Sequence, residues 1–121
     1  MPDLTKSKFH TQGYTIASTS ADASATVVYT CPNNFSAITR YLHISNNDNA
    51  TKKVYVQFYH AEDAAYHYIA NSLSMAGHSV TNLVNGGYFN LHSGDKILVY
   101  GETTNTMEVL VSVEEYFDPN R

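Results

Sequence analysis

The sequence predicts an all-β fold: an antiparallel β-sandwich of jelly-roll type with an extended N-terminal arm. Three observations support this prediction. The 121 residues correspond to one domain of ordinary size. Short runs that alternate apolar and polar residues recur about every ten positions, with turn residues between them. The 11 Ser, 12 Thr and 11 Asn also favour strands and turns over helices.

Residues 1–24 are expected to form the arm. They are polar, have no sustained period and end in a run of small residues at 17–24. Large apolar residues are sparse there, so Leu4, Phe9, Tyr14 and Ile16 are predicted to anchor the arm. Two surfaces remain open for these anchors, the chain's own sheet and a neighbouring subunit.

The β-sandwich domain is expected over residues 25–117, and residues 118–121 form a short C-terminal tail. Alternation is clearest where Val54, Val56 and Phe58 share one face of a strand. Asn, Gly, Pro and Ser clusters bound the other runs, and no segment has a persuasive helical period. The predicted strands are residues 25–30, 36–46, 53–60, 66–74, 78–84, 88–91, 96–101 and 107–117.

Charge and composition exclude several classes of function. The net charge is −4, and no basic cluster is larger than Lys52-Lys53, so a nucleic-acid partner is not expected. No apolar run approaches the length of a membrane span, so a membrane partner is not expected either. One cysteine, Cys31, cannot form an internal disulfide. That single thiol and the lack of a signal-like N-terminal run favour intracellular synthesis.

No catalytic, cofactor-binding or metal-binding residue is predicted. The six histidines form no metal motif, although His43 and His60 would approach each other if their strands paired. Glu114 and Glu115 are neighbours on a strand and point to opposite faces, so they cannot act as a carboxylate pair. Residues 93–95, Ser-Gly-Asp, fit a tight turn before a strand. The chain is therefore not expected to be an enzyme.

The ten tyrosines are the strongest functional signal. Tyrosine combines a large rigid ring with a hydroxyl, which suits surfaces that become buried on contact. Three interpretations remain open: a subunit interface, a second core of cross-strand pairs, or a sugar-binding platform. The candidate interface tyrosines are Tyr41, Tyr55, Tyr59, Tyr66 and Tyr68.

Two long segments resemble a known group of proteins. The run VVYTCPNNFSAITRYLHISNNDNATKKVYVQFYH and the run SLSMAGHSVTNLVNGGYFNLHSGDKILVYGETTNTMEVLVSVEEY are similar to small all-β virion proteins of tailed bacteriophages. The resemblance covers residues 25–117. It implies a structural protein without catalysis and supplies no functional residues to transfer.

The resemblance implies a virion protein made in the host cytoplasm, most simply a capsid decoration, or cement, protein. A neck or tail component and a carbohydrate-binding receptor-recognition module are the alternatives. The implied partners are other virion proteins and further copies of this chain, with a trimer as the first candidate oligomer. A glycan is the partner in the carbohydrate alternative, and no cofactor is expected.

Overall fold

The computed structural model describes residues 3–84 and 87–119, with side chains from residue 8 onward. Within these ranges the chain forms nine strands and one short 3₁₀ helix, η1 (Asp22–Ser24). The strands are β1 (Asp3–Thr15), β2 (Thr26–Thr30), β3 (Phe35–Asn46), β4 (Lys52–His60), β5 (Ala65–Met75), β6 (Val80–Asn82), β7 (Phe89–Leu91), β8 (Lys96–Gly101) and β9 (Met107–Phe117).

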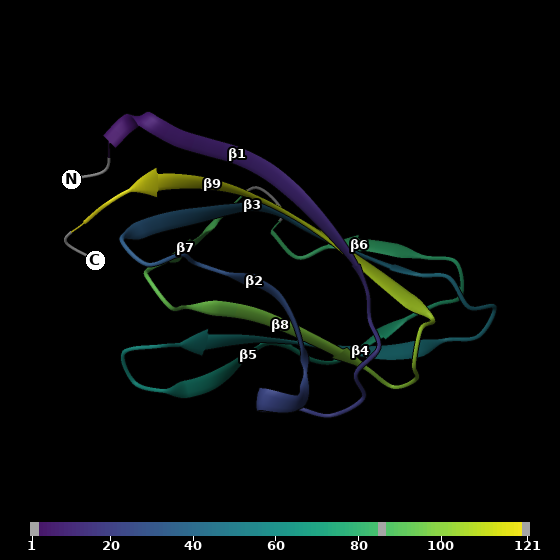
Figure 1. Cartoon of the computed structure of the whole chain (residues 1–121). Helices are drawn as coiled ribbons and strands as arrows, with labels where there is room; N and C mark the ends of the chain where they lie inside the picture. The colour runs from purple at the N-terminus through teal and green to yellow at the C-terminus, as the bar shows by residue number, and fades with distance from the viewer. Residues whose placement is uncertain (1–2, 85–86, 120–121) are drawn as a thin grey trace.

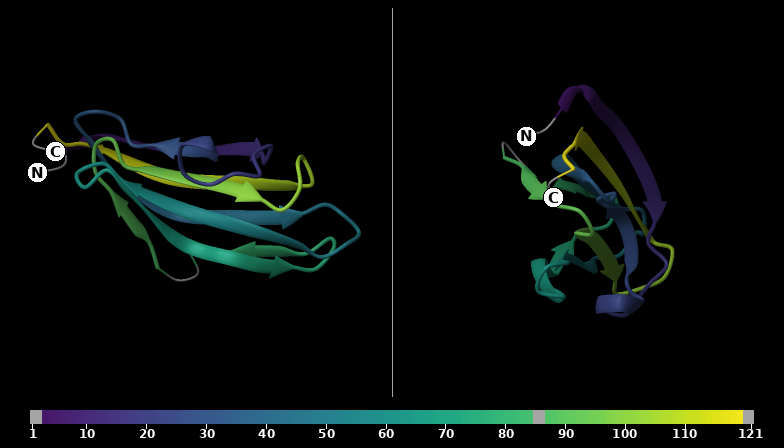
Figure 2. Two further views of the ribbon diagram at one scale, coloured as in Figure 1. Left: turned by 90° about the horizontal axis from the view of Figure 1, so that it is seen from below. Right: turned by 60° about the vertical axis from the view of Figure 1, so that its left-hand side comes forward.

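The strands form two antiparallel sheets that pack face to face (Figure 1). The first sheet, called sheet A here, has the order β1-β9-β3-β6, and β7 also pairs with β3. The second, sheet B, has the order β2-β8-β4-β5. Figure 2 shows the two layers from two further sides, with β1 along the outer margin of sheet A. The chain is thus an all-β protein of two antiparallel sheets, as the sequence predicts.

The core lies between the two sheets and is built from the alternating apolar residues of each strand. On β9 the inward positions carry Val109, Val111 and Val113, all buried. On β4 the inward positions carry Val54 and Val56, which are fully buried in the same cluster. Burial of such side chains contributes roughly 1.5–3 kcal/mol each, which makes this layer the main source of stability.

Each of the eight predicted strands is present; the ends differ by one residue at most, except in β6, which is two residues shorter at each end than predicted. The Ser93-Gly94-Asp95 turn is confirmed as well. Gly94 has a φ of 87°, which favours glycine. The buried Asp95 carboxylate accepts the backbone N–H groups of His92 and Ala61, both at 2.9 Å. Asp95 therefore stabilises this turn, which is a structural role.

The prediction of a separate arm over residues 1–24 needs correction. Residues 3–15 form β1, which pairs antiparallel with β9 as an edge strand of the chain's own sheet. Ile16 follows directly and is fully buried, with its N–H bonded to Met107 O at 2.9 Å. Of the two surfaces that the sequence left open, β1 lies on the chain's own sheet.

His43 and His60 do not approach through strand pairing, because β3 belongs to sheet A and β4 to sheet B. In the described residues, no group of three or more His, Cys, Asp or Glu side chains is placed to hold a metal ion. The same residues contain no helix with the length and apolar character needed to cross a membrane.

Candidate interaction surfaces

The outward face of sheet B carries the tyrosines that alternation predicts there. Tyr55 and Tyr100 are directly opposite on β4 and β8, and their rings stack 4.5 Å apart. Tyr59 and Tyr66 are opposite on β4 and β5, with ring centroids 4.8 Å apart. These rings form cross-strand pairs within the chain and so act as a second, smaller core.

Hydroxyl contacts extend this tyrosine cluster. Tyr68 and Tyr100 hydroxyls lie 2.6 Å apart, and Ser72 donates to the Tyr55 hydroxyl at 3.0 Å. Burial and the contact with Tyr68 raise the pKa of Tyr100 above its ordinary value. The ring of Tyr68 is 46% exposed, more than the other rings of this face. The Tyr55 and Tyr100 rings are parallel, whereas the Tyr59 and Tyr66 rings are tilted by 49°.

η1 covers one end of the tyrosine face. Asp22 and Gln57 form a reciprocal pair, in which the Asp22 N–H donates to Gln57 Oε1 at 2.9 Å and Gln57 Nε2 donates to Asp22 Oδ1 at 2.8 Å. Gln57 is buried although it lies on the outward side of β4. This part of sheet B is therefore already covered by the chain itself.

The outward face of sheet A is different, because its large apolar side chains have little cover. Phe9 on β1 is 70% exposed and Leu110 on β9 is 42% exposed. Tyr41 on β3 is also exposed and stacks on His43, with ring centroids 5.6 Å apart. We call Phe9, Leu110 and Tyr41 the exposed apolar face. They lie on three adjacent strands of one rigid sheet.

Polar groups lie between and beside these side chains. The register places Thr11, Ser112 and Tyr41 in one row across β1, β9 and β3, and the Thr11 and Ser112 hydroxyls are 2.6 Å apart. At one end of the face Arg40 Nε donates to Glu114 Oε1 at 2.8 Å. Hydrogen bonds from Tyr116 and then from Arg40 hold the pKa of Glu114 below its usual range. Exposed apolar side chains with hydrogen-bonding groups between and beside them are compatible with a protein interface.

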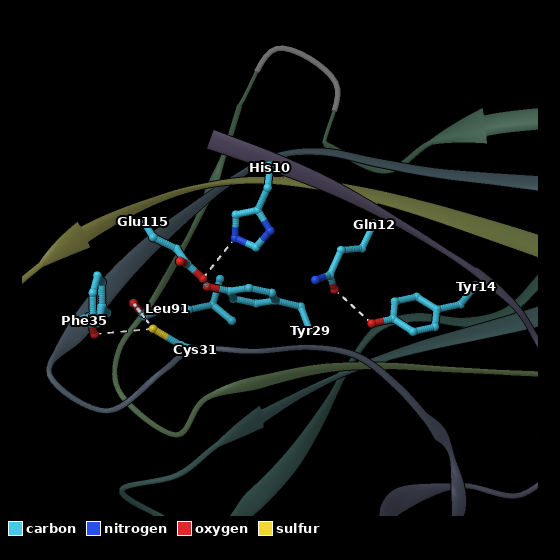
Figure 3. Close-up of polar contacts among 8 residues, drawn as sticks. All are labelled: His10, Gln12, Tyr14, Tyr29, Cys31, Phe35, Leu91 and Glu115. Carbon is cyan, nitrogen blue, oxygen red and sulfur yellow. Dashed lines mark hydrogen bonds and ion pairs between the residues drawn. The ribbon is translucent and has the colours of Figure 1, made fainter. Parts of the chain in front are cut away.

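A polar cluster lies where the edges of the two sheets face each other (Figure 3). Glu115 of β9 points inward, is buried, and accepts the Tyr29 hydroxyl of β2 at 2.5 Å. His10 Nε2 of β1 lies 3.1 Å from the same oxygen of Glu115. The residues that line the open hollow of about 310 Å³ beside it are His10, Gln12, Tyr14, Val27, Tyr29, Thr30, Pro32 and Glu115.

This cluster connects the sheets and offers no ready nucleophile. Burial, and then the bond to Glu115, raise the pKa of Tyr29 far above its ordinary value, so its hydroxyl keeps the proton. Cys31 is buried, and its thiol points at the carbonyl oxygens of Phe35 and Leu91. Burial and the nearby carboxylates of Glu115 and Asp95 raise the pKa of Cys31 to about 12. A thiol that stays protonated is a poor nucleophile at neutral pH.

The predicted site residues are therefore divided among several environments. Tyr55, Tyr59, Tyr66 and Tyr68 share the outward face of sheet B, whereas Phe9 and Tyr41 lie on that of sheet A. Tyr14 is half-buried and donates to Gln12 Oε1 at 2.8 Å. Ile16 belongs to the core, because it is enclosed by its own chain. The side chain of Leu4 lies outside the described part of the structure.

Two features escaped the sequence analysis. Leu110 is not among the predicted contact residues, although its outward position between Glu108 and Ser112 indicates that it is exposed. Glu115 is in phase with Val109, Val111 and Val113, so a carboxylate falls on the core side of β9. A carboxylate at a buried position of a strand is expected to have a hydrogen-bonding partner. The partners of Glu115 are Tyr29 and His10.

Comparison with known proteins gives little beyond the fold. No family model matches the chain, and no curated protein matches it either. Among solved structures, the chain is similar to a protein described under "Bacillus endospore appendages form a novel family of disulfide-linked pili", with a TM-score of 0.51 and 14% sequence identity. The match covers 93% of this chain and 87% of that chain. At this identity the likeness shows the two-sheet fold alone.

Proposed function

We propose that this chain is a non-enzymatic structural protein of a tailed-phage virion, most simply a capsid decoration protein. The observation that carries the proposal is the exposed apolar face of sheet A. Phe9, Leu110 and Tyr41 lie uncovered on adjacent strands, whereas the tyrosines of sheet B pair with each other. Large exposed apolar side chains gathered on one face, with hydrogen-bonding groups between and beside them, are compatible with a surface that a partner covers.

The mechanism of such a protein is adhesive. Apolar area removed from water contributes roughly 25 cal/mol per Å², before the costs of association are subtracted. The sheet presents this area without rearrangement, because β9 is held on both sides by β1 and β3. Thr11 and Ser112 offer hydroxyls in the middle of the face for hydrogen bonds to the partner.

The strand order supports a jelly-roll topology within this proposal. Each sheet contains one path of four strands, and β1, β3 and β9 meet in sheet A while β2, β4 and β8 meet in sheet B. This alternation between sheets is the arrangement of two Greek keys in a jelly roll. Jelly rolls are common in viral capsid domains and in lectins, so the fold suits the proposed class without selecting it.

The similar solved structure also supports an assembly role, because its description names pili, which are polymers of a structural subunit. That description includes disulfide linkage, and this chain differs on that point. Its one cysteine, Cys31, is 1% exposed, so its thiol is not placed to bond a neighbouring subunit. Assembly of this chain therefore relies on noncovalent contacts.

Reconstitution on particles tests the proposal. Purified particles of the phage that encodes the chain are separated into heads and tails, the chain is stripped from the fraction that holds it, and recombinant protein is added back. The double variant Tyr41→Ser, Leu110→Ser is expected to bind at least roughly tenfold more weakly than the wild type, because it removes two apolar side chains from the face. Val27→Ser, which changes an exposed apolar residue of β2 in sheet B, is the matched control and should bind normally.

Location decides between the forms of the proposal. A chain found with the heads supports decoration, and one found with the tails supports the neck or tail alternative. Absence of the chain from both fractions refutes a virion role. Equal binding by the double variant and the wild type refutes the assignment of the exposed apolar face as the contact surface.

A further inference from the structure

β1 is an edge strand of sheet A. It is thirteen residues long and, among the described residues, pairs on one side only, with β9, since sheet A has the order β1-β9-β3-β6. From Lys8 to Thr15 the register to β9 is regular, without a bulge. A long regular edge is a template for another strand, and proteins usually interrupt or cover such edges. Along residues 8–15, β1 has no proline and one lysine.

The pairing fixes which backbone groups face the open side. The Ile16 N–H bonds to Met107 O, in the same register as the pairs of β1 with β9. Hydrogen-bonded and non-bonded pairs alternate along an antiparallel ladder. The N–H and C=O groups of His10, Gln12 and Tyr14 therefore face β9. Those of Phe9, Thr11, Gly13 and Thr15 face away and are available to a second strand.

We infer that β1 pairs antiparallel with β1 of a second copy, with the twofold axis at Thr11. This inference rests on the proposed function, because it names a subunit contact of the assembly. In this register Thr11 is opposite Thr11 of the second copy, and Phe9 is opposite Gly13. All these residues have outward-facing backbone groups, so the ladder of hydrogen bonds continues across the axis.

Side chains on the outward face select this register. Phe9 is large and 70% exposed, whereas Gly13 has no side chain. The Leu110 side chain lies directly beside Gly13, because a Cβ added to Gly13 would be 2.8 Å from Leu110 Cδ2. The Phe9 ring of one copy would thus pack beside Gly13 and against Leu110 of the other. Both halves gain this contact, because a twofold interface repeats each contact.

Charges also permit the register. On the inward side of the two β1 strands, His10 of one copy is opposite Gln12 of the other, and Lys8 is opposite Tyr14. These pairs therefore place no like charges opposite each other. The two Lys8 residues are six positions apart along the paired strands, or about 20 Å. That separation exceeds the Debye length of about 8 Å at physiological salt, so their repulsion is screened. Shifting the axis to His10 would place the two His10 rings opposite each other, and shifting it to Phe9 would oppose the two phenylalanines.

Edge pairing joins two copies and leaves the total number of copies undetermined, so the trimer remains a separate prediction. One pair of strands forms a smaller contact than a standard interface of about 1,600 Å². The dimer is therefore expected to depend on concentration in solution and to be reinforced by other contacts in an assembly.

Cysteine cross-linking tests the register. Thr11→Cys places two thiols at the axis, where hydrogen-bonded partners have Cα atoms about 5.5 Å apart, within the range for a disulfide. Thr15→Cys is the matched control on the same edge and face, because its two copies would be eight positions, or about 27 Å, apart. The buried Cys31 stays in both variants. Under mild oxidation the full chain with Thr11→Cys should form a covalent dimer, and Thr15→Cys should remain monomeric.

A second measurement covers the case in which Thr11→Cys loses its fold along with the Thr11–Ser112 contact. Sedimentation of the wild type should show a concentration-dependent dimer. Phe9→Ser should weaken it by roughly tenfold or more, whereas Val80→Ser on the opposite edge should leave it unchanged. A strictly monomeric wild type, or equal cross-linking of both cysteine variants, overturns the inference.

The two proposals fail separately. If the protein binds the particle normally but forms no dimer, only the β1 pairing is refuted. If the protein dimerises normally but is absent from virions, only the virion role is refuted.

Discussion

Replacement of Asn46 by alanine should strongly destabilise the fold. Asn46 ends β3, is fully buried, and connects the turn after β3 to the end of β5. Its amide nitrogen has two N–H bonds, which Met75 O at 2.9 Å, Ala50 O at 3.0 Å and Ala76 O at 3.2 Å share as acceptors. Its Oδ1 accepts the Asp48 N–H at 3.0 Å.

The magnitude follows from these contacts. A net hydrogen bond contributes about 1 kcal/mol, and a buried group left without a partner costs about 1–3 kcal/mol. Loss of the Asn46 amide removes at least two bonds and leaves the buried Met75 carbonyl oxygen without this donor. The free energy of unfolding should fall by about 3–5 kcal/mol, a large part of the usual 5–15 kcal/mol.

Equilibrium unfolding in urea measures this change, followed by tyrosine fluorescence because the chain has ten Tyr and no Trp. Asn47→Ala is the matched control. Asn47 is the next residue, is exposed, and donates its amide to Glu108 Oε1 at 2.7 Å. Its loss should cost less than about 1 kcal/mol. If the two variants lose equal stability, the role given to the buried amide is wrong.

Three further predictions follow from burial and backbone geometry. Cys31 should react with an aromatic disulfide reagent at pH 8 only after unfolding, because it is buried and its pKa is raised to about 12; rapid reaction in the native state would contradict this. The free energy of unfolding should fall as pH rises above about 9, since the unfolded chain releases protons from Cys31 and Tyr29 that the folded chain keeps, and a flat profile from pH 9 to 11 would contradict it. Gly77→Ala should lower the melting temperature strongly, because its Cβ would lie 2.2 Å from Asn49 O, whereas Gly87→Ala meets nothing within 4 Å; equal melting temperatures would count against the described turn.

Alternation made most of the fold predictable from the sequence. β4 and β9 bury one face and expose the other, so their apolar residues recur with period two. β1 lacks that signal. Its inward side faces the open hollow through His10 and Gln12, and its outward side carries Thr11 and Gly13. A strand with polar residues on both sides resembles an extended arm until its hydrogen-bonded partner is known.

The exposed apolar face was only partly predictable for a related reason. Phe9 and Tyr41 were candidate contact residues, but the register that brings them beside Leu110 is set by β9, a hundred residues along the chain from β1. The tyrosines of sheet B illustrate the opposite case. Alternation predicts that Tyr55 and Tyr59 lie on the outward face, but their ring contacts with Tyr100 and Tyr66 depend on strand order, which the alternation does not contain.

A density map of the native particle at side-chain resolution would test whether the outward face of sheet A is the contact surface. We expect the chain to occupy the virion surface, with Phe9, Leu110 and Tyr41 of sheet A buried against a neighbouring subunit. The paired tyrosines Tyr55 and Tyr100 should keep their intramolecular stacking. A map in which the outward face of sheet A is open to solvent while another surface makes the contacts would show that the proposed contact surface is wrong.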